Sequence, residues 1–494
     1  MANYKSFAFK EGFYVYIDKL QFDEGATAII GSGLAALAIL EKSNFIKNTI
    51  IFEQGNHFDP QNYQGLDINN ASSFALKTQT VEESLGGSSN TWTGRLSEMT
   101  EYEFQGMQPK DGLIDSIFKD LQKVYYQKAW KFFNFKPSYS QTVSTKGNFE
   151  ERVLPAQKKP LRVAKALKKI PVQIILNQKV LYVGTDSDGS FLITSFDGQL
   201  SKKCYFKKII IATGGIQSIN LINRSIEMGF MKSNPSLTPG AGYMNHPKFS
   251  LINFTSGDKN SSTFQFPEYY SEDFIAYSLS DAKKNKLQAS NTFFTFQPVY
   301  EDEHTNEFLA ARNLYANKKS FFKYFSKHLK NSNKNIFVFT AKFIKFLLFF
   351  LRMKLLKVRY YNLLFFLEME ALSTNYISEN MGKINVSVKL SNNDIQSVKK
   401  LFSELVGELG SSNINKDYVN LDFQNIQMQD ASHHIGGLSM NNNKELSFVD
   451  KNLQLNCSPN IYICSSSVFP RSGSCNPTLT IVALGLRLGD HLNS

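Results

Sequence analysis

The sequence lacks the features that define several classes of protein. Its four cysteines, Cys204, Cys457, Cys464 and Cys475, show neither the paired spacing of a metal site nor the density of a disulfide scaffold. We therefore expect no metal site and a reduced, cytoplasmic chain. Residues 1–20 interleave charged and aromatic residues without an apolar stretch, so they do not read as a secretory signal.

Repeats and flexible linkers are absent as well. No period typical of solenoids or propellers is visible, and no Pro-rich or Gly/Ser-rich stretch divides the chain. A length of 494 residues nevertheless exceeds one ordinary core, so we expect two domains that are interleaved in sequence. With 42% hydrophobic and 20% charged residues, the composition is globular and excludes a disordered, collagen-like or coiled-coil chain.

The net charge of +12 arises from one segment. Between Phe308 and Leu367 lie thirteen of the 55 Lys and Arg residues and no Asp or Glu, so the other 42 bases nearly balance the 43 acids. A local excess of this kind does not indicate a nucleic-acid-binding surface, and we expect no nucleic-acid partner.

The same segment is rich in apolar residues. Its most apolar stretch, Ile336 to Leu351, contains Lys342 and Lys345, which argues against a transmembrane helix. A helix would be amphipathic, with one basic face formed by Lys342, Lys345, Arg352 and Arg359. Residues 318–359 could rest peripherally on the inner face of a membrane, or pack on the protein's own core or an acidic partner subunit.

A dinucleotide-binding pattern lies near the N-terminus. An apolar strand, Ala26–Ile30, leads directly into Gly31-Ser-Gly33-Leu-Ala-Ala36 and a helix, Leu34–Lys42. Glu53 ends the next strand, 22 residues after Gly31. Such glycines let the backbone approach a pyrophosphate, and a carboxylate at this spacing binds a ribose hydroxyl. The pattern predicts a dinucleotide site without distinguishing FAD from NAD.

Later strands end in small residues. Ile209–Ile211 leads into Ala212-Thr-Gly214, and Ile461–Cys464 leads into Ser465 and Ser466, as parallel strands do where the backbone approaches a ligand. From Phe249 to Ser412 the pattern changes to aromatic-rich strands, followed by a helix at Asp394–Leu409, which indicates a second domain inserted into the first. Further strands are expected at Val172–Leu176, Val180–Val183, Phe191–Thr194 and Lys208–Ile211.

Three other motifs carry candidate site residues. The loop Gly86–Gly94 is small and polar apart from Trp92, which suits contact with a planar group or a phosphate as well as it suits a surface loop. His433-His-Ile-Gly-Gly437 and Asn476-Pro477-Thr478 follow, the latter opening an apolar helix to about Leu492. Alone, Asn476 before a proline is typical of a helix cap.

Taken together and in this order, the motifs resemble the glucose-methanol-choline (GMC) oxidoreductases, a family of FAD-dependent alcohol oxidases and dehydrogenases. The resemblance extends to Gly242-Tyr-Met-Asn-His246-Pro247. It implies an α/β FAD-binding, Rossmann-like domain of the GMC type with an inserted α+β substrate domain built on an antiparallel sheet. It assigns residues 1–105, 150–247 and 415–494 to the FAD-binding domain, and residues 106–149 and 248–414 to the substrate-binding domain.

The resemblance also implies the cofactor and its contacts. FAD would be held without a covalent bond, since Thr91 stands where covalent relatives have the attaching histidine. Two positions depart from the family: Ser465 replaces a usual acidic residue, and Asn245 replaces an Asp. The expected contacts are Gly31, Gly33, Ala36, Glu53, Gly86, Gly87, Ser88, Ser89, Asn90, Thr91, Trp92, Val180, Ala212, Gly214, Ser465, Ser466, Asn476, Pro477 and Thr478.

Within the family, His433 and Asn476 resemble the catalytic pair of the His/Asn group, which includes pyranose oxidases, cholesterol oxidases and bacterial sugar dehydrogenases. His434 is adjacent, but the motif register favours His433. A neutral imidazole suits removal of a hydroxyl proton while flavin N5 takes the hydride. The expected function is FAD-dependent oxidation of a hydroxyl on a sugar-like or other secondary alcohol.

Two other functions stay open at this point. One is a flavoprotein without net redox chemistry, such as a lyase; the other is a membrane-surface binding protein on the same scaffold. The expected partners are a small alcohol or sugar and an electron acceptor, which the sequence leaves open between oxygen, a quinone and a redox protein.

Overall fold

A computed structural model of the chain describes residues 25–493 with gaps at 42–47, 60–66, 71, 73, 75, 78–80, 107–110, 137–140, 142, 158, 197–198, 255–262, 268–272, 302–304, 307–343, 345–357, 381–382 and 410–425. The membrane contact expected of residues 318–359 therefore falls almost entirely outside the described residues. Arg359 is described and lies in a strand, so the prediction that it belongs to a basic helical face is wrong. Among the described residues, no helix is long and apolar enough to cross a membrane.

A five-stranded parallel sheet forms the first layer, in the order β18-β11-β1-β2-β6. All residues of β1 and β2 are buried, because both faces of the sheet are covered, and this explains why their sequences are continuous apolar runs. The strands are β1 (Thr27–Ile30), β2 (Thr49–Phe52), β6 (Gln173–Ile175), β11 (Lys208–Ile211) and β18 (Ile461–Ile463).

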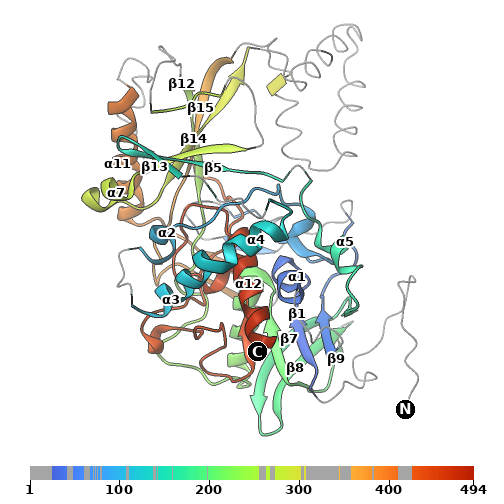
Figure 1. Ribbon diagram of the computed structural model, residues 1–494. Coiled ribbons are helices and arrows are strands. Elements are labelled where there is room, and N and C mark those ends of the chain that lie inside the picture. The colour runs from blue at the N-terminus through green and yellow to red at the C-terminus, as the bar shows by residue number, and fades with distance from the viewer. Residues whose placement is uncertain are drawn as a thin grey trace.

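Two helices pack closely beside this sheet. Helix α1 (Leu34–Leu40) follows β1, and the C-terminal helix α12 (Thr478–Asn493) lies against it (Figure 1). Gly485 and Gly489 lie on the contact face of α12. A Cβ atom would come within 2.9 Å of the Ala38 Cβ at Gly485 and within 2.7 Å of the Ile39 carbonyl oxygen at Gly489. Only glycine permits this close approach. The contact holds α12 against α1, and the first residue of α12, Thr478, lies at the carboxyl edge of the sheet.

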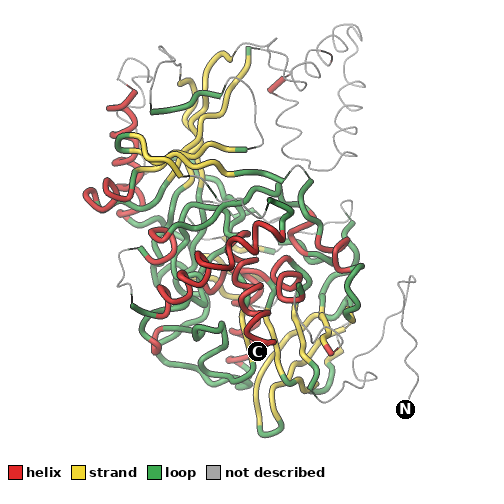
Figure 2. The backbone as a smooth tube through the Cα atoms, in the orientation of Figure 1, coloured by secondary structure: helices red, strands yellow, loops and turns green. Residues whose placement is uncertain are grey.

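A six-stranded antiparallel sheet lies on the other side of the molecule, in the order β12-β15-β14-β13-β5-β4 (Figures 1 and 2). Alternating residues divide its two faces: Phe365 packs near Phe402 of α11, whereas Phe366 faces the central cavity. The strands are β4 (Val143–Lys146), β5 (Phe149–Leu154), β12 (Lys248–Phe254), β13 (Phe274–Leu279), β14 (Phe293–Tyr300) and β15 (Val358–Phe366).

Two smaller sheets complete the fold: β7 (Lys179–Asp186), β8 (Gly189–Phe196), β9 (Gln199–Leu200) and β10 (Cys204–Phe206) form one, and β3 (Ile68–Asn70), β16 (Tyr376–Asn380) and β17 (Lys383–Ser387) the other. The remaining α-helices are α2 (Glu101–Gln105), α3 (Leu113–Asp120), α4 (Tyr126–Phe132), α5 (Val163–Leu167), α6 (Gly214–Glu227), α7 (Asp281–Leu287) and α11 (Asn392–Leu409). The expectation of a mixed α/β fold with an antiparallel sheet is confirmed. The division into domains stays a prediction, and β5 crosses its boundary at residue 150.

Candidate active site

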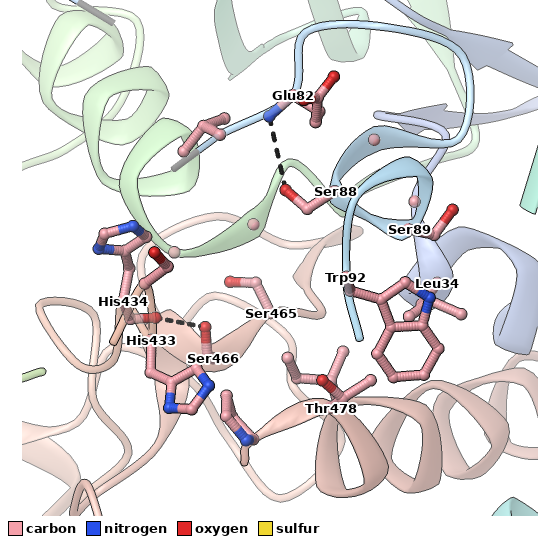
Figure 3. Close-up of a pocket in the computed structure, with 18 of the residues that line it drawn as sticks. Leu34, Glu82, Ser88, Ser89, Trp92, His433, His434, Ser465, Ser466 and Thr478 are labelled. Atoms are coloured by element: carbon pink, nitrogen blue, oxygen red, sulfur yellow. Dashed lines mark hydrogen bonds between the residues drawn. The ribbon is translucent and has the colours of Figure 1, made fainter. Parts of the chain in front are cut away.

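One cavity of about 1390 Å³ lies between the carboxyl ends of the parallel strands and the antiparallel sheet. It exceeds the roughly 300–1,000 Å³ of a typical small-ligand pocket, which leaves room for a dinucleotide and a second molecule. Of the expected site residues, those that line it are Gly31, Gly33, Glu53, Gly87, Ser88, Ser89, Thr91, Trp92, Val180, Ala212, Gly214, His433, Ser465, Ser466, Asn476, Pro477 and Thr478, several of which are drawn in Figure 3.

Three expected residues lie outside the cavity lining. Ala36 is fully buried in the middle of α1. Gly86 lies behind the loop, where a Cβ atom would come within 2.9 Å of the Ala164 nitrogen. Asn90 donates from its side-chain amide to the Leu85 carbonyl at 3.0 Å and to the Ser84 hydroxyl at 3.2 Å, so it holds the shape of the loop.

The two glycines of the first motif serve different purposes. Gly31 has φ +92°, and a Cβ atom there would lie 2.7 Å from the Ala212 carbonyl oxygen, so only glycine fits the turn. Gly33 has an ordinary φ of −80°, and a Cβ atom there would have no neighbour within 4 Å. Because Gly33 lines the cavity, a side chain at this position would occupy ligand space.

The loop after Leu85 closes over these glycines as a short 3₁₀ helix, Gly87–Asn90. The Gly86 nitrogen donates to the Ser32 hydroxyl at 2.8 Å, and a Cβ atom at Gly87 would be 3.7 Å from the Gly33 Cα. The two glycine-containing segments thus pack directly against each other, and Gly33 and Gly87 both line the cavity. This arrangement suits a pyrophosphate, which backbone N–H groups bind.

Two carboxylates lie at this end of the cavity. Glu53 accepts hydrogen bonds from the Ser32 nitrogen (3.1 Å), the Ser32 hydroxyl (2.6 Å) and the Gly55 nitrogen (3.0 Å), and burial raises its pKa. Burial also raises the pKa of Glu82 to about 7, and its Oε2 has no hydrogen-bond partner among the described residues. A carboxyl group accepts up to about four hydrogen bonds, so both can still receive hydroxyl groups of a ribose or ribityl chain. These residues fit FAD.

The candidate base, His433, and its neighbour His434 lie in a segment aligned antiparallel to residues 244–248. Two isolated bridges, Met244 with Ile435 and Lys248 with Gln429, hold the segments side by side. Ser432 adopts a left-handed φ of 63°, and its nitrogen donates to Asp430 at 2.6 Å. This turn directs the next side chain, His433, toward the partner segment.

His433 and His246 share a hydrogen bond of 2.9 Å between their Nδ1 atoms. His246 Nε2 lies 2.9 Å from the Ser472 carbonyl oxygen, which can only accept, so this Nε2 carries the proton. The Nδ1 of neutral His246 must then accept the proton of His433 Nδ1. His433 Nε2 consequently keeps its lone pair, and no described residue donates to it.

The surroundings keep His433 in its neutral form. Burial lowers its pKa well below the ordinary value, and repulsion from His246, His434, Lys248 and Lys77 lowers it further. An unprotonated imidazole that lines a cavity and exposes a lone pair is suited to accept a proton from a ligand.

His434 has different partners. Its Nδ1 lies 2.7 Å from the Tyr243 hydroxyl, the two rings are stacked with 22° between their planes, and its carbonyl accepts from Ser466. Gly436, at φ +74°, approaches the Gly242 carbonyl so closely that a Cβ atom would lie 2.6 Å away. The His-His-Ile-Gly-Gly sequence is therefore needed for both the position of the rings and the turn behind them.

Asn476 reaches the cavity from the start of α12. The residue is half-buried and lines the cavity. Among the described residues, none forms a hydrogen bond with its side-chain amide. The amide is available to a ligand oxygen. Helix α12 begins two residues later, so its positive end is directed toward the cavity as well.

The sequence did not predict His246, Glu82, Lys77, Arg95 or Lys248 as residues of the site. His246 belongs to a quoted motif, but its contact with His433 joins positions 187 residues apart. The three cations line the cavity and belong to no motif. The only available signal was for Lys248, which follows His246-Pro247 at the start of an aromatic-rich strand.

Comparisons with known proteins agree with this description. The C-terminal sequence profile of the family described as GMC oxidoreductase matches residues 381–485. No curated protein matches the sequence. Among solved structures, pyridoxine 4-oxidase from Mesorbium loti has a TM-score of 0.56 at 11% identity, and a fungal aryl-alcohol oxidase has 0.53 at 12%. Each alignment covers 95% of this chain and 99% of the other. The resemblance to the GMC oxidoreductases, which are flavoproteins, is thereby confirmed.

Proposed function

We propose that the protein oxidises an alcohol hydroxyl with FAD. The premise is that the chain resembles the GMC oxidoreductases in its C-terminal sequence and in its fold. The observation that carries this proposal is the neutral His433, whose Nε2 lone pair is left free by the bond to His246. Alcohol oxidation requires such a base, because a proton must leave the hydroxyl as a hydride leaves the same carbon.

The side chains take separate roles in this reaction. His433 accepts the hydroxyl proton and becomes an imidazolium. Asn476 donates a hydrogen bond from its amide to the substrate oxygen and so orients the alcohol. The hydride acceptor would be supplied by FAD bound in the same cavity. The positive end of α12 favours negative charge in the neighbouring part of the cavity.

FAD would be held by the adjacent glycines Gly33 and Gly87 and by the carboxyl groups of Glu53 and Glu82. Ala212 and Ser465, which follow the ends of two parallel strands, would contact it as well. We propose that it is bound without a covalent link, because Thr91 has no nucleophilic nitrogen. Acid precipitation should release yellow flavin into the supernatant. Colour retained in the pellet would show that the flavin is covalently attached.

Alcohol-dependent reduction of the bound flavin tests the function. Purified protein is mixed without oxygen with a panel of alcohols, and the loss of flavin absorbance is followed. His433→Ala should retain flavin but reduce it about 10²- to 10⁴-fold more slowly, as expected for loss of a general base.

A matched control is His491→Ala, since this histidine lies near the end of α12, away from the cavity lining. It should behave as the unmodified protein does. Equal reduction rates in His433→Ala and the unmodified protein would refute the role of His433. Flavin that no alcohol reduces would favour the non-redox alternative.

A further inference from the structure

Most of the charged residues that line the cavity lie at its two ends, and the remaining one, Arg224, is ion-paired with Glu379. The acids Glu53, Glu82 and Glu83 lie beside the glycine loops: the Glu53 carboxylate accepts from Ser32, and the backbones of Glu82 and Glu83 contact Ser88 and Gly55. Three cations, Lys77, Arg95 and Lys248, lie at the end where His433 opens into the cavity. The cations are thus separate from the part that fits a pyrophosphate.

Lys77 and Lys248 are held at this end by the backbone around His433. The Lys77 nitrogen donates to Asp430 at 3.1 Å, and Lys248 pairs through both backbone groups with Gln429. The charge of Asp430 favours the ammonium form of Lys248, but its oxygens already accept from the Lys77 and Ser432 nitrogens. Among the described residues, neither lysine side chain forms an ion pair within 4 Å.

The position of Lys248 is unfavourable for a charged ammonium group. Burial lowers the pKa of Lys248, and repulsion from Lys77 and Arg95 lowers it further, while Asp430 offsets only part of this. Lys77 is exposed and Lys248 is half-buried, so a bound anion would chiefly offset the partial loss of water around Lys248.

The wall beside Lys248 is apolar and aromatic. Lys248, Phe366 and Phe293 lie opposite one another on three adjacent strands and therefore share a face of the sheet. The two phenylalanine rings stack with centroids 4.8 Å apart, and the Arg95 guanidinium lies 3.3 Å from the ring centroid of Phe274. This apolar surface, which has cations at its edge, suits contact with the carbon skeleton of a substrate.

We propose that the substrate is an alcohol carrying a carboxylate or phosphate, whose anionic group binds Lys248, with Lys77 and Arg95 beside it, while its carbon skeleton rests on Phe293 and Phe366. This inference rests on the proposed alcohol oxidation and names its substrate class. His433 would then meet the hydroxyl at the other end of the same molecule.

Matched pairs of alcohols test the inference. The pairs are para-(hydroxymethyl)benzoate with benzyl alcohol, and glucose phosphate with glucose. Within each pair, the ratio of the two KM values measures the effect of the anionic group. Comparing the two ratios shows whether the site prefers a carboxylate or a phosphate. The anionic member should have a KM about 10- to 100-fold lower, which is the gain in affinity expected from one charge-assisted hydrogen bond. Lys248→Met should abolish most of this preference, and Lys383→Met, on the exposed surface, should not change it.

Binding gives a second readout that needs no turnover. Benzoate should perturb the flavin spectrum of the unmodified protein, whereas benzamide should not, and Lys248→Met should weaken benzoate binding about 10-fold or more. If benzoate binds in this way but no alcohol reduces the flavin, the anion site stands and the proposed reaction is wrong. Equal use of neutral and anionic alcohols, or no benzoate binding, would overturn the inference.

Discussion

A histidine can act as a base only if the correct nitrogen is unprotonated. In this protein the choice is made by a chain of hydrogen bonds from His433 through His246 to the Ser472 carbonyl. His246 does not line the cavity, so it acts on the reaction through His433 alone. We regard it as a positioning residue.

Replacing His246 should therefore affect the rate and spare substrate binding. In His246→Leu the Nδ1 proton of His433 loses its acceptor, and the inactive tautomer becomes accessible. We expect the limiting rate of flavin reduction to fall about 10- to 100-fold with little change in KM, measured by rapid mixing without oxygen.

His246→Asn provides the control, because its side-chain oxygen can lie where Nδ1 lay and accept the same proton. It should recover much of the lost rate, which a purely structural role would not require. A KM that rises with an unchanged rate, or His246→Asn as slow as His246→Leu, would contradict the positioning role.

The pH dependence follows from the same residue. Since the pKa of His433 lies well below 6.5, the base stays neutral as the pH falls through the ordinary histidine range. The kcat/KM of the unmodified protein should accordingly decline only at a pH below about 6.5. A decline centred above that value would place the titrating group elsewhere.

At the scale of elements, the sequence predicted the strands of the parallel sheet almost to the residue. Ile50–Phe52 and Ile209–Ile211 are continuous apolar runs because both sheet faces are buried, and their ends are marked by Glu53 and by Ala212-Thr-Gly214. For the antiparallel sheet, the sequence predicted that such a sheet exists but not the order or the pairing of its strands. Its register depends on pairings such as Lys248 with Phe366, which join residues too distant for any local pattern to reveal.

Gly33 allows the predicted dinucleotide site to be tested without disturbing the fold. Its φ of −80° suits any residue, and the space beyond its Cα is open. Gly33→Val should still fold, at a cost of about 0.5–2 kcal/mol because valine is a poor residue for the N-cap of α1, and it should bind FAD about 10-fold or more weakly because the side chain fills ligand space. Flavin content after purification and fluorescence titration of the apoprotein measure this.

Gly407→Ala is a matched control in helix α11, where a Cβ atom also meets no neighbour within 4 Å. It should leave FAD binding unchanged and stabilise the helix by about 0.5–1 kcal/mol. Unchanged FAD affinity in Gly33→Val would mean that the dinucleotide does not pass this position.

At the scale of the whole molecule, a buried ionic cluster connects the antiparallel sheet with the loop that carries Asn476. Arg152 of β5 lies 2.9 Å from Glu103 of α2 and 2.6 Å from the Cys475 sulfur, and the Cys475 thiol donates to Glu103 at 2.9 Å. The cysteine that the sequence presented as isolated thus takes part in fixing the loop beside the catalytic residues.

Replacement of Arg152 should show how strongly this connection stabilises the fold. Although burial alone would raise it, the pKa of Glu103 is lowered to about 2 by Arg152, Cys475 and nearby groups. Its contribution to stability is therefore present above pH 4.5 and lost as the pH falls toward 2. Arg152→Met leaves Glu103 charged and buried without its partner, so the free energy of unfolding at neutral pH should fall by about 3–5 kcal/mol.

Urea denaturation at two pH values distinguishes this cause from simple loss of packing. In Arg152→Met the pKa of Glu103 must rise, so that acidification protonates it and the deficit relative to the unmodified protein becomes smaller. Glu103→Gln together with Arg152→Met should cost less than the sum of the single changes, because neither member of the pair is left charged and buried without the other. The exposed control Lys383→Met should change neither curve. A deficit that is equal at both pH values, with additive single changes, would mean that Arg152 stabilises the loop by packing and not by its charge.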